Sequence, residues 1–422
     1  MRIKTIHIEN FRGITDQIFN FDEKSSVLFG INGSGKTTVL QAVNLVFSNV
    51  VNRLVQNRFK QKNSIESRDV KVGSSTCEIV VDFTYDQTNF TYGRRFDKKS
   101  NKRILVHASD LNDFAESFSK LNPGAYANAD NQVVNLPIYV NYGVNRSVVD
   151  VPLRIRKAHI FDPLYAYENA VQSKVDFRTF FEWFRNREDY ENEIRVNQDI
   201  NFSDQQLKSV RKAVETLLGW EDYSNLCVKR NPLGMKISKN GIAFDIRQLS
   251  DGEKCALALV GDLARRAAMA NPYSANPLET TGIVLIDEVE LHLHPTWQRR
   301  IVPTLHDIFP QIQFLISTHS PQVLGEIPDD MKVFALSNSN ATLNVREMKS
   351  LRWWDINSIL ENNMQTSAQN LNIRGRINRA YDLVNDEKYS EAEEIVDELE
   401  AKTSSKHQDV VRLRFLINRG RR

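Results

Sequence analysis

Nine residues near the N-terminus, 30–38, constrain the fold more than any other stretch of the chain. They read Gly-Ile-Asn-Gly-Ser-Gly-Lys-Thr-Thr and fit the pattern G-x-x-x-x-G-K-[ST] of a phosphate-binding loop. A short apolar run at 27–29 predicts a buried strand before the loop, and apolar residues at helical spacing over 39–47 predict a helix after it. The alternative is a glycine-rich turn that only caps a helix, but strand, loop and helix in this order favour a nucleoside triphosphate site.

The chemistry of such a loop predicts which residues contact the nucleotide. Backbone N–H groups at a helix N-terminus point at phosphates, and the helix dipole favours negative charge there. We expect the Lys36 ammonium to reach the β- and γ-phosphates and the Thr37 hydroxyl to ligate Mg²⁺. The residues predicted to bind the nucleotide here are Gly30, Asn32, Gly33, Ser34, Gly35, Lys36, Thr37 and Thr38.

Composition limits the class of protein and its compartment. At 422 residues the chain exceeds one average domain, so two or three lobes are expected. A net charge of +2 does not indicate a nucleic-acid binder, so any such surface must be local. The cysteines, Cys77, Cys227 and Cys255, stand far apart without metal spacing, as suits a reducing cytoplasm. No apolar run approaches the roughly 18 residues that span a bilayer, and the N-terminus is not a signal peptide, so we expect a cytoplasmic protein that makes no membrane contact.

The first part of the chain, 1–150, is predicted to surround the loop with strands. Alternating and apolar runs predict these strands at 2–10, 14–21, 77–85, 88–96 and 136–143. A dense basic stretch, 94–103, forms the end of the second hairpin. It has two interpretations, a solvated hairpin tip or a contact with a nucleic-acid backbone.

The middle part, 151–241, has a helical character. Four phenylalanines at i, i+3, i+4 and i+7 predict a helix that buries an aromatic stripe in a core, and they are Phe177, Phe180, Phe181 and Phe184. Because this part lies between two motif-bearing parts, we predict that it is an inserted helical lid.

The third part, 242–347, carries Leu-Ser-Asp-Gly-Glu-Lys at 249–254 before a predicted long helix. Ser250 and Glu253 fit a capping box. Gly252 needs a different reason, because glycine in a helix costs about 1 kcal/mol relative to alanine. Glycine lets a phosphate or another backbone come close, and this motif by itself does not decide between them.

Two predicted strands of this part end in ionisable residues. An apolar run at 282–286 predicts a strand buried in a parallel sheet, and Asp287 and Glu288 follow it. Ligands bind at this edge of open α/β sheets. Asp287 is suited to hold Mg²⁺, and Glu288 to orient and deprotonate an attacking water. His319 ends another apolar run, and beside a phosphate loop and a carboxylate pair it is predicted to contact the γ-phosphate.

Taken together, these motifs resemble the ABC-type ATPase heads of the SMC/RecF kind, in the branch of AAA-labelled ATPases found beside bacterial defence nucleases. The resemblance covers nearly all of residues 1–345. It implies a P-loop NTPase of the α/β class, an ABC-ATPase head with N-terminal β hairpins, an inserted helical lid and a C-terminal α-helical tail. The opening segment 8–13 is similar to the start of that group, and Arg12 within it is expected to contact the nucleotide. Long heptad arms are absent from this sequence.

The resemblance also implies roles for the site residues. Lys36 and Thr37 match the Walker A pair, Asp287 the Walker B aspartate, Glu288 the catalytic glutamate and His319 the switch histidine. The signature is matched by Ser250, Gly252 and Glu253, which in such families contact the γ-phosphate held by the opposing subunit. ATP hydrolysis then requires a head-to-tail homodimer, and higher homo-oligomers are expected from it. The usual lid-side glutamine is not obvious, and Asn141 or a neighbour is left as the candidate.

The tail, 348–422, predicts short amphipathic helices that need a partner surface to bury their apolar stripe. Its segments 354–360 and 387–400 resemble the tail of the ATPase subunits of Septu antiphage systems, a group that also accompanies some retrons and acts with a separately encoded HNH nuclease. The resemblance implies a slow ATPase that controls that nuclease through nucleotide-dependent dimerisation. The tail has no E-G pair followed by a D-x-D, so no nuclease is expected in the same chain.

Two other functions stay open. One is a RecF-like DNA-repair ATPase that clamps DNA, which tight and salt-dependent DNA binding by the isolated chain would favour. The other is an ATP-dependent assembly scaffold with little turnover. Contact with DNA or with retron RNA/DNA is open as well.

Overall fold

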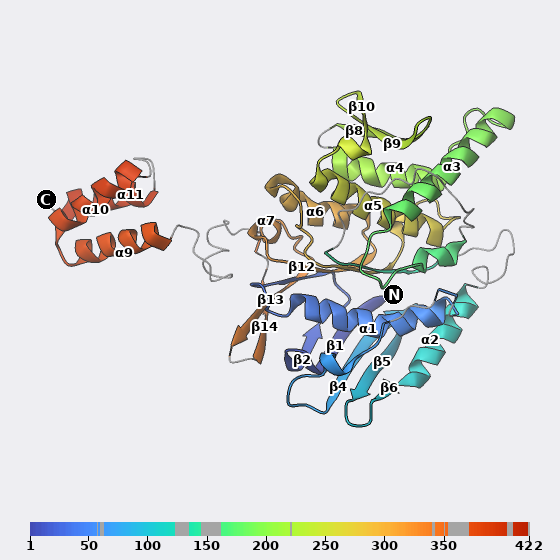
Figure 1. The fold of residues 1–422 in the computed structure, drawn as a ribbon, viewed down its shortest axis with the longest axis horizontal. Coiled ribbons are helices and arrows are strands. Elements are labelled where there is room, and N and C mark those ends of the chain that lie inside the picture. The colour runs from blue at the N-terminus through green and yellow to red at the C-terminus, as the bar shows by residue number, and fades with distance from the viewer. Residues whose placement is uncertain are drawn as a thin grey trace. The chain divides into compact units, whose positions relative to one another are not determined.

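The computed structural model is built around a six-stranded, mostly parallel sheet (Figure 1). In spatial order its strands are β14 (Thr342–Met348), β13 (Lys332–Ser339), β3 (Ser26–Phe29), β12 (Ile312–Thr318), β11 (Gly282–Ile286) and β7 (Ile138–Tyr142). The pairings from β13 to β7 are all parallel, and β14 pairs antiparallel with β13. Every residue of β3, β7, β11 and β12 is buried, which confirms the strands predicted from apolar runs.

The chain divides into two units, Met1–Trp354 and Asp355–Arg422. The structure describes residues 1–56, 58–59, 63–122, 135–144, 162–219, 222–339, 342–349, 351–352, 371–402 and 408–420. The tail segment at 354–360 and the start of the predicted lid at 151–161 lie outside these residues. Within them, no helix has the length and apolar character that a membrane span requires.

A second, antiparallel sheet belongs to the N-terminal part and confirms both predicted hairpins. Its strands are β2 (Ile14–Asn20), β1 (Arg2–Phe11), β4 (Thr76–Tyr85), β5 (Thr88–Asp97) and β6 (Lys102–Val106). Helix α1 (Lys36–Leu54) runs between this sheet and the central one (Figure 1). Its apolar residues are buried on both sides for that reason. Helix α2 (Ala108–Leu121) packs on β5.

The basic stretch 94–103 does not behave as one surface. Arg94 is only 7% exposed, and its Nη1 donates to the backbone carbonyls of Leu45 at 2.7 Å and Asn63 at 2.8 Å. It therefore joins α1 to the segment after it and is unable to contact a nucleic acid. The exposed cations of the stretch are Arg95, Lys98, Lys99, Lys102 and Arg103, around the β5–β6 turn.

Helices cover the other face of the central sheet (Figure 1). They are α3 (Phe177–Asn197), α4 (Gln205–Leu218), α5 (Asp251–Ala270) and α6 (Pro295–Ile308). The phenylalanine stripe of α3 is buried, as its spacing predicts. The prediction of helix up to residue 241 is wrong, because β8 (Tyr223–Arg230) and β9 (Leu233–Lys239) form a three-stranded antiparallel sheet with β10 (Ile242–Asp245).

A buried charge network fixes α5 to the end of β7. Asp262 is fully buried and accepts hydrogen bonds from Arg265 at 2.6 Å, Arg266 at 2.8 Å and the Tyr142 hydroxyl at 2.7 Å. Burial would raise the pKa of Asp262, but the two guanidinium groups outweigh it and lower that pKa to about 2. The backbone carbonyl of Tyr142 in turn accepts the Asp287 N–H at 2.8 Å. Helix α5 is thus linked to the strand end that carries the predicted acidic pair.

The described residues of the C-terminal unit form α9 (Leu371–Asn385), α10 (Tyr389–Lys402) and α11 (Gln408–Gly420). These confirm the helices predicted for the tail. Their buried residues form one core, made of Ile377, Ala380, Ala392, Val396, Leu399, Val410, Leu413 and Ile417. The expectation that the apolar stripe needs a partner surface is therefore wrong, because the third helix covers it. The opposite side of α11 still exposes Val411 by 53% and Phe415 by 64%.

Candidate functional site

The phosphate-binding loop joins the buried strand β3 to α1. Gly35 is the N-cap residue of α1 and has φ +100°, a conformation that other residue types adopt only with strain. The N-terminus of α1 has no side-chain cap and no acidic residue in its first turn. An anion can therefore satisfy its first N–H groups, and the helix dipole favours that anion.

Lys36 is the buried cation of the loop. Its ammonium donates to the carbonyls of Gly30 at 2.7 Å and Ile31 at 3.1 Å, and the residue is 6% exposed. Burial lowers the pKa of Lys36, and nearby carboxylates oppose that effect. A phosphate could take the place of the two carbonyls and would offset the buried charge more fully.

Thr37 and Asp287 come together although they are far apart in the sequence. The Thr37 hydroxyl lies 3.0 Å from each carboxylate oxygen of Asp287. Ser317, at the end of β12, donates to the same carboxylate at 2.5 Å and accepts the Glu288 N–H at 2.8 Å. Ser317 thus holds the Asp287 carboxylate and the backbone of Glu288, a role that the sequence does not indicate. A hydroxyl and a carboxylate side by side are hard oxygen donors of the kind that Mg²⁺ prefers.

One cavity of about 490 Å³ collects the predicted phosphate contacts. Glu288 and His319 reach it from the ends of β11 and β12. The loop contributes the other lining residues, Asn32, Gly33, Ser34, Gly35, Lys36, Thr37 and Thr38. The structure therefore places the loop, a carboxylate and an imidazole around one space large enough for phosphate groups.

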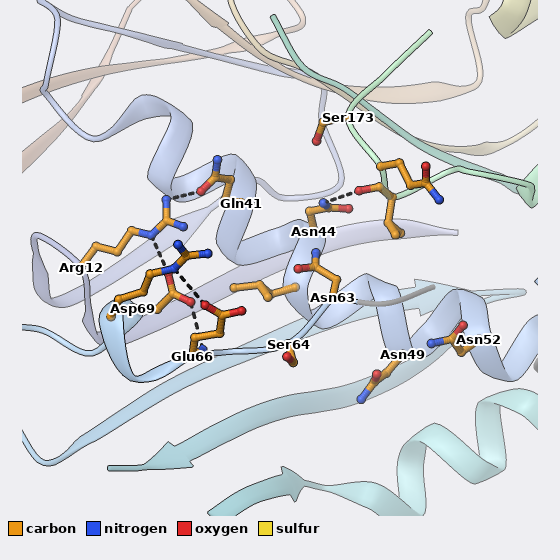
Figure 2. A pocket seen from close by; sticks show the side chains of 14 residues that line it. Arg12, Gln41, Asn44, Asn49, Asn52, Asn63, Ser64, Glu66, Asp69 and Ser173 are labelled. Carbon is orange, nitrogen blue, oxygen red and sulfur yellow. Dashed lines mark hydrogen bonds and ion pairs between the residues drawn. The ribbon is translucent and has the colours of Figure 1, made fainter. Parts of the chain in front are cut away.

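Arg12 lies outside that cavity. Its guanidinium bonds to the Asp69 carboxylate at 3.0 Å and to the side chain of Gln41, as Figure 2 shows. These residues belong to a larger cavity of about 750 Å³ beside α1. Its lining is mostly polar and consists of Arg12, Gln41, Asn44, Leu45, Asn49, Asn52, Asn63, Ser64, Glu66, Arg68, Asp69, Val171, Gln172 and Ser173. Both cavities adjoin α1, so they are neighbours along one helix.

Asn141 is the candidate for the lid-side amide. It is 4% exposed, and its amide donates to the Ser173 hydroxyl at 2.6 Å. It does not line the loop cavity. In this conformation its side chain is committed to the segment before α3, and the assignment stays open.

The signature residues form the capping box at the N-terminus of α5. The Ser250 hydroxyl accepts the Glu253 N–H, and the Glu253 carboxylate accepts the Ser250 N–H at 2.7 Å. Glu253 also bonds to Lys239 at 2.9 Å and to the Tyr223 hydroxyl. Burial would raise the pKa of Glu253, but these hydrogen bonds lower it to about 2. In this conformation the Glu253 carboxylate holds the turn, and its expected contact with a nucleotide on an opposing subunit stays a prediction.

Position 252 requires glycine because another backbone segment passes close to it. A Cβ on this residue would lie 2.8 Å from the carbonyl oxygen of His292. The turn thus rests on the segment that follows Glu288. Ser250 is exposed, and neither it nor Gly252 lines the loop cavity of its own chain.

Comparison with known proteins agrees with this geometry. A family model described as an AAA domain matches residues 5–218, and one described as "AAA domain, putative AbiEii toxin, Type IV TA system" matches residues 159–325. The chain is 31% identical to the retron Ec83 probable ATPase of Escherichia coli, over 80% of this chain and 72% of that protein. It is 24% identical to the Septu protein PtuA of Bacillus thuringiensis, over 86% of this chain and 84% of that protein. An SMC head solved with the C-winged helix domain of ScpA has the same fold, with a TM-score of 0.50 at 14% identity, over 83% of this chain and 98% of that one.

Replacing Gly252 with alanine should destabilise the protein. Alanine normally stabilises a helix relative to glycine, but here its Cβ would press on a backbone carbonyl that has no flexible end to move. We expect a loss of about 1–3 kcal/mol in the free energy of unfolding, measured by urea denaturation. Gly219→Ala is the matched control, because its Cβ would meet no atom within 4 Å. A Gly252→Ala protein as stable as the parent would contradict this account of the turn.

Proposed function

The chain belongs to the AAA-domain ATPase family that includes the retron Ec83 probable ATPase, and from this premise we propose that it binds ATP with Mg²⁺ and hydrolyses it in an antiphage defence system. The observation that carries the proposal is the loop cavity, which Glu288 and His319 share with the phosphate-binding loop. The bond between Thr37 and Asp287 adds a place for the metal ion.

Each residue of the cavity has a task in phosphoryl transfer to water. The loop N–H groups and Lys36 would bind the phosphates. Thr37 and Asp287 would hold Mg²⁺, which when bound offsets the negative charge of the phosphate oxygens. Glu288 would orient the attacking water and accept its proton, and His319 would donate to the terminal phosphate.

The larger, polar cavity beside α1 would accommodate the nucleoside part of ATP. Gln41 lies five residues beyond Lys36 on α1, which is about 7.5 Å along the helix axis. Arg12 bonds to Gln41 and to Asp69, so it lies beside this part of α1. We assign the contact of Arg12 to the nucleoside side of ATP, and not to its terminal phosphate.

The signature turn fits a second subunit. Ser250 is exposed at the N-terminus of α5, yet it lies outside its own loop cavity, so its hydroxyl is accessible to a second chain. We propose a head-to-tail homodimer in which Ser250 and Gly252 of each chain contact the γ-phosphate held by the other. Such dimers would form the unit of larger homo-oligomers.

ATP would act as the switch of the assembly. A γ-phosphate bridging two heads changes their relative orientation, which is a bistable rigid-body transition. We propose that this transition controls a separately encoded HNH nuclease bound by the C-terminal helices. The exposed Val411 and Phe415 of α11 are the apolar contacts that this unit offers to that nuclease.

Substitutions in the loop cavity separate binding from hydrolysis. Lys36→Ala should abolish binding of a fluorescent ATP analogue, because it removes the cation that faces the phosphates. Glu288→Gln should keep binding but slow phosphate release by about 100-fold or more, since glutamine accepts no proton. Lys102→Ala, on the exposed strand β6, is the control and should change neither value. Unchanged turnover in Glu288→Gln would remove Glu288 from the proposed role.

Mixing two inactive variants tests the shared site. Lys36→Ala lacks the loop cation, and Ser250→Arg should block the signature turn, so neither homodimer has a complete site. A mixed dimer would contain one intact site, formed by the loop of one chain and the turn of the other. Random pairing at equal concentration should restore about a quarter of the parental ATPase rate. If mixed dimers form without any recovery of hydrolysis, or if Ser250→Arg is fully active by itself, the proposed dimer is wrong.

A substitution on α11 tests the nuclease partner. Phe415→Glu should abolish co-purification of the HNH nuclease and protection against phage, with the ATPase rate unchanged. Val196→Glu is a matched control, because Val196 is 83% exposed on α3, outside the proposed contact. Retained co-purification with Phe415→Glu would exclude this surface.

Tight, salt-dependent DNA binding by the chain without a nuclease would favour the RecF-like alternative. The exposed cations of the β5–β6 turn are the side chains that would contact the DNA backbone.

A further inference from the structure

A third carboxylate near the loop cavity has no task in the proposed hydrolysis. Glu290 is 6% exposed, two residues after Glu288. Its Oε1 accepts the backbone N–H of His319 at 2.7 Å and lies 3.3 Å from Nδ1 of the same histidine. Its Oε2 has no hydrogen-bond partner among the residues that the structure describes.

A carboxylate in this position needs a positive partner. Burial of an ionised carboxylate is unfavourable unless a cation or a donor offsets its charge. In the described part of the chain, His319 is the basic side chain within ion-pair distance of Glu290. Glu290 is also the foremost of the three carboxylates that oppose the burial-driven lowering of the Lys36 pKa, ahead of Glu288 and Asp287. No ion pair joins Glu290 to Lys36 in the described part of the chain, so its direct basic contact in the loop cavity is His319.

The two ring nitrogens of His319 have different surroundings. Nδ1 is buried 3.3 Å from Oε1 of Glu290 and makes no hydrogen bond with a described residue in this conformation. The side chain as a whole is 38% exposed and lines the loop cavity. The exposed edge of the ring is therefore the one that carries Nε2. A carboxylate beside one ring nitrogen favours a proton there and fixes the orientation of the ring, which decides what the other nitrogen presents.

We propose that Glu290 is a positioning residue, which holds His319 by its backbone N–H and by Nδ1–H so that Nε2–H points at the terminal phosphate of ATP. This inference rests on the proposed function, because it needs a nucleotide in the loop cavity. A ring that carried a proton on Nδ1 alone would turn a lone pair toward the phosphate. With a carboxylate on one side and a phosphate on the other, each ring nitrogen faces an acceptor for an N–H donor.

Glu290→Gln tests the charge while it keeps the geometry. Glutamine has the same size, and its Oε1 still accepts the His319 N–H, so the segment after β12 stays in place. We expect kcat to fall about 10- to 100-fold, with KM for ATP and affinity for ADP changed less than about twofold, because ADP has no terminal phosphate at the imidazole. Equal thermal midpoints of Glu290→Gln and the parent would confirm that the fold is intact.

The decisive measurement is kcat in a double-mutant cycle with His319→Ala. If Glu290 acts through the ring, adding Glu290→Gln to His319→Ala lowers kcat no further than His319→Ala does. Three results would overturn the inference: kcat losses of the two substitutions that multiply in the double variant, an unchanged kcat in Glu290→Gln alone, or an equal loss of ADP binding in Glu290→Gln. Failure of the parent chain to hydrolyse ATP would instead overturn the proposed function.

A second pair of variants covers the case in which Glu290→Gln does not fold. Glu290→Asp keeps the charge at a shorter reach, and Glu290→Asn removes the charge at that same reach. The inference expects Glu290→Asp to be about 10-fold faster in kcat than Glu290→Asn at equal thermal stability. Equal rates in the two variants would contradict it.

Discussion

The register of three parallel strands determines where the chemistry of this protein can occur. Phe29 at the end of β3 pairs with Thr318 of β12, and Ile286 at the end of β11 pairs with Ile316. The phosphate-binding loop, the acidic pair and His319 therefore leave the sheet at one edge, although Thr37 of the loop and Asp287 are 250 residues apart in the sequence. A slip of one residue in β12 would turn Ser317 to the other face of the sheet and free the Asp287 carboxylate from it. The hydrogen bonds of Ser317 to the Asp287 carboxylate and to the Glu288 N–H are thus a direct product of this pairing.

Local patterns in the sequence predicted those elements of the structure that neighbouring residues determine. The loop motif predicts the start of α1, because glycine conformations and an uncapped helix N-terminus are properties of neighbouring residues. Apolar runs predict the buried strands of the central sheet for the same reason. The strand β8 was missed because a register shift between Ser224 and Cys227 breaks its alternation of buried and exposed residues.

Long-range partners could not be predicted from the sequence. Arg94 stands in a basic stretch, but it is buried against distant partners, the carbonyls of Leu45 and Asn63 and the Ser48 hydroxyl. Glu290 had a signal, an additional acid two residues after Glu288, but its partner His319 becomes adjacent only through the β11–β12 pairing. Gly252 is a similar case. From the sequence, the glycine could leave room for either a phosphate or another backbone segment, and the structure places the carbonyl oxygen of His292 next to it.

Two links tie the signature helix to the strand that carries the acidic pair. At the N-terminus of α5, Gly252 rests on the backbone of His292, four residues after Glu288. Near its middle, Asp262 is joined through Tyr142 to the backbone of Asp287. Removing the Asp262 carboxylate would break the second link and leave the buried guanidinium groups of Arg265 and Arg266 without their partner, which is strongly unfavourable. Helix α5 therefore moves together with the edge of the central sheet. In the proposed dimer, the signature turn of each chain faces one ATP molecule, and the acidic pair of the same chain faces the other. A movement of the turn at one nucleotide would therefore also move the acidic pair at the second nucleotide, because α5 joins them as one rigid body.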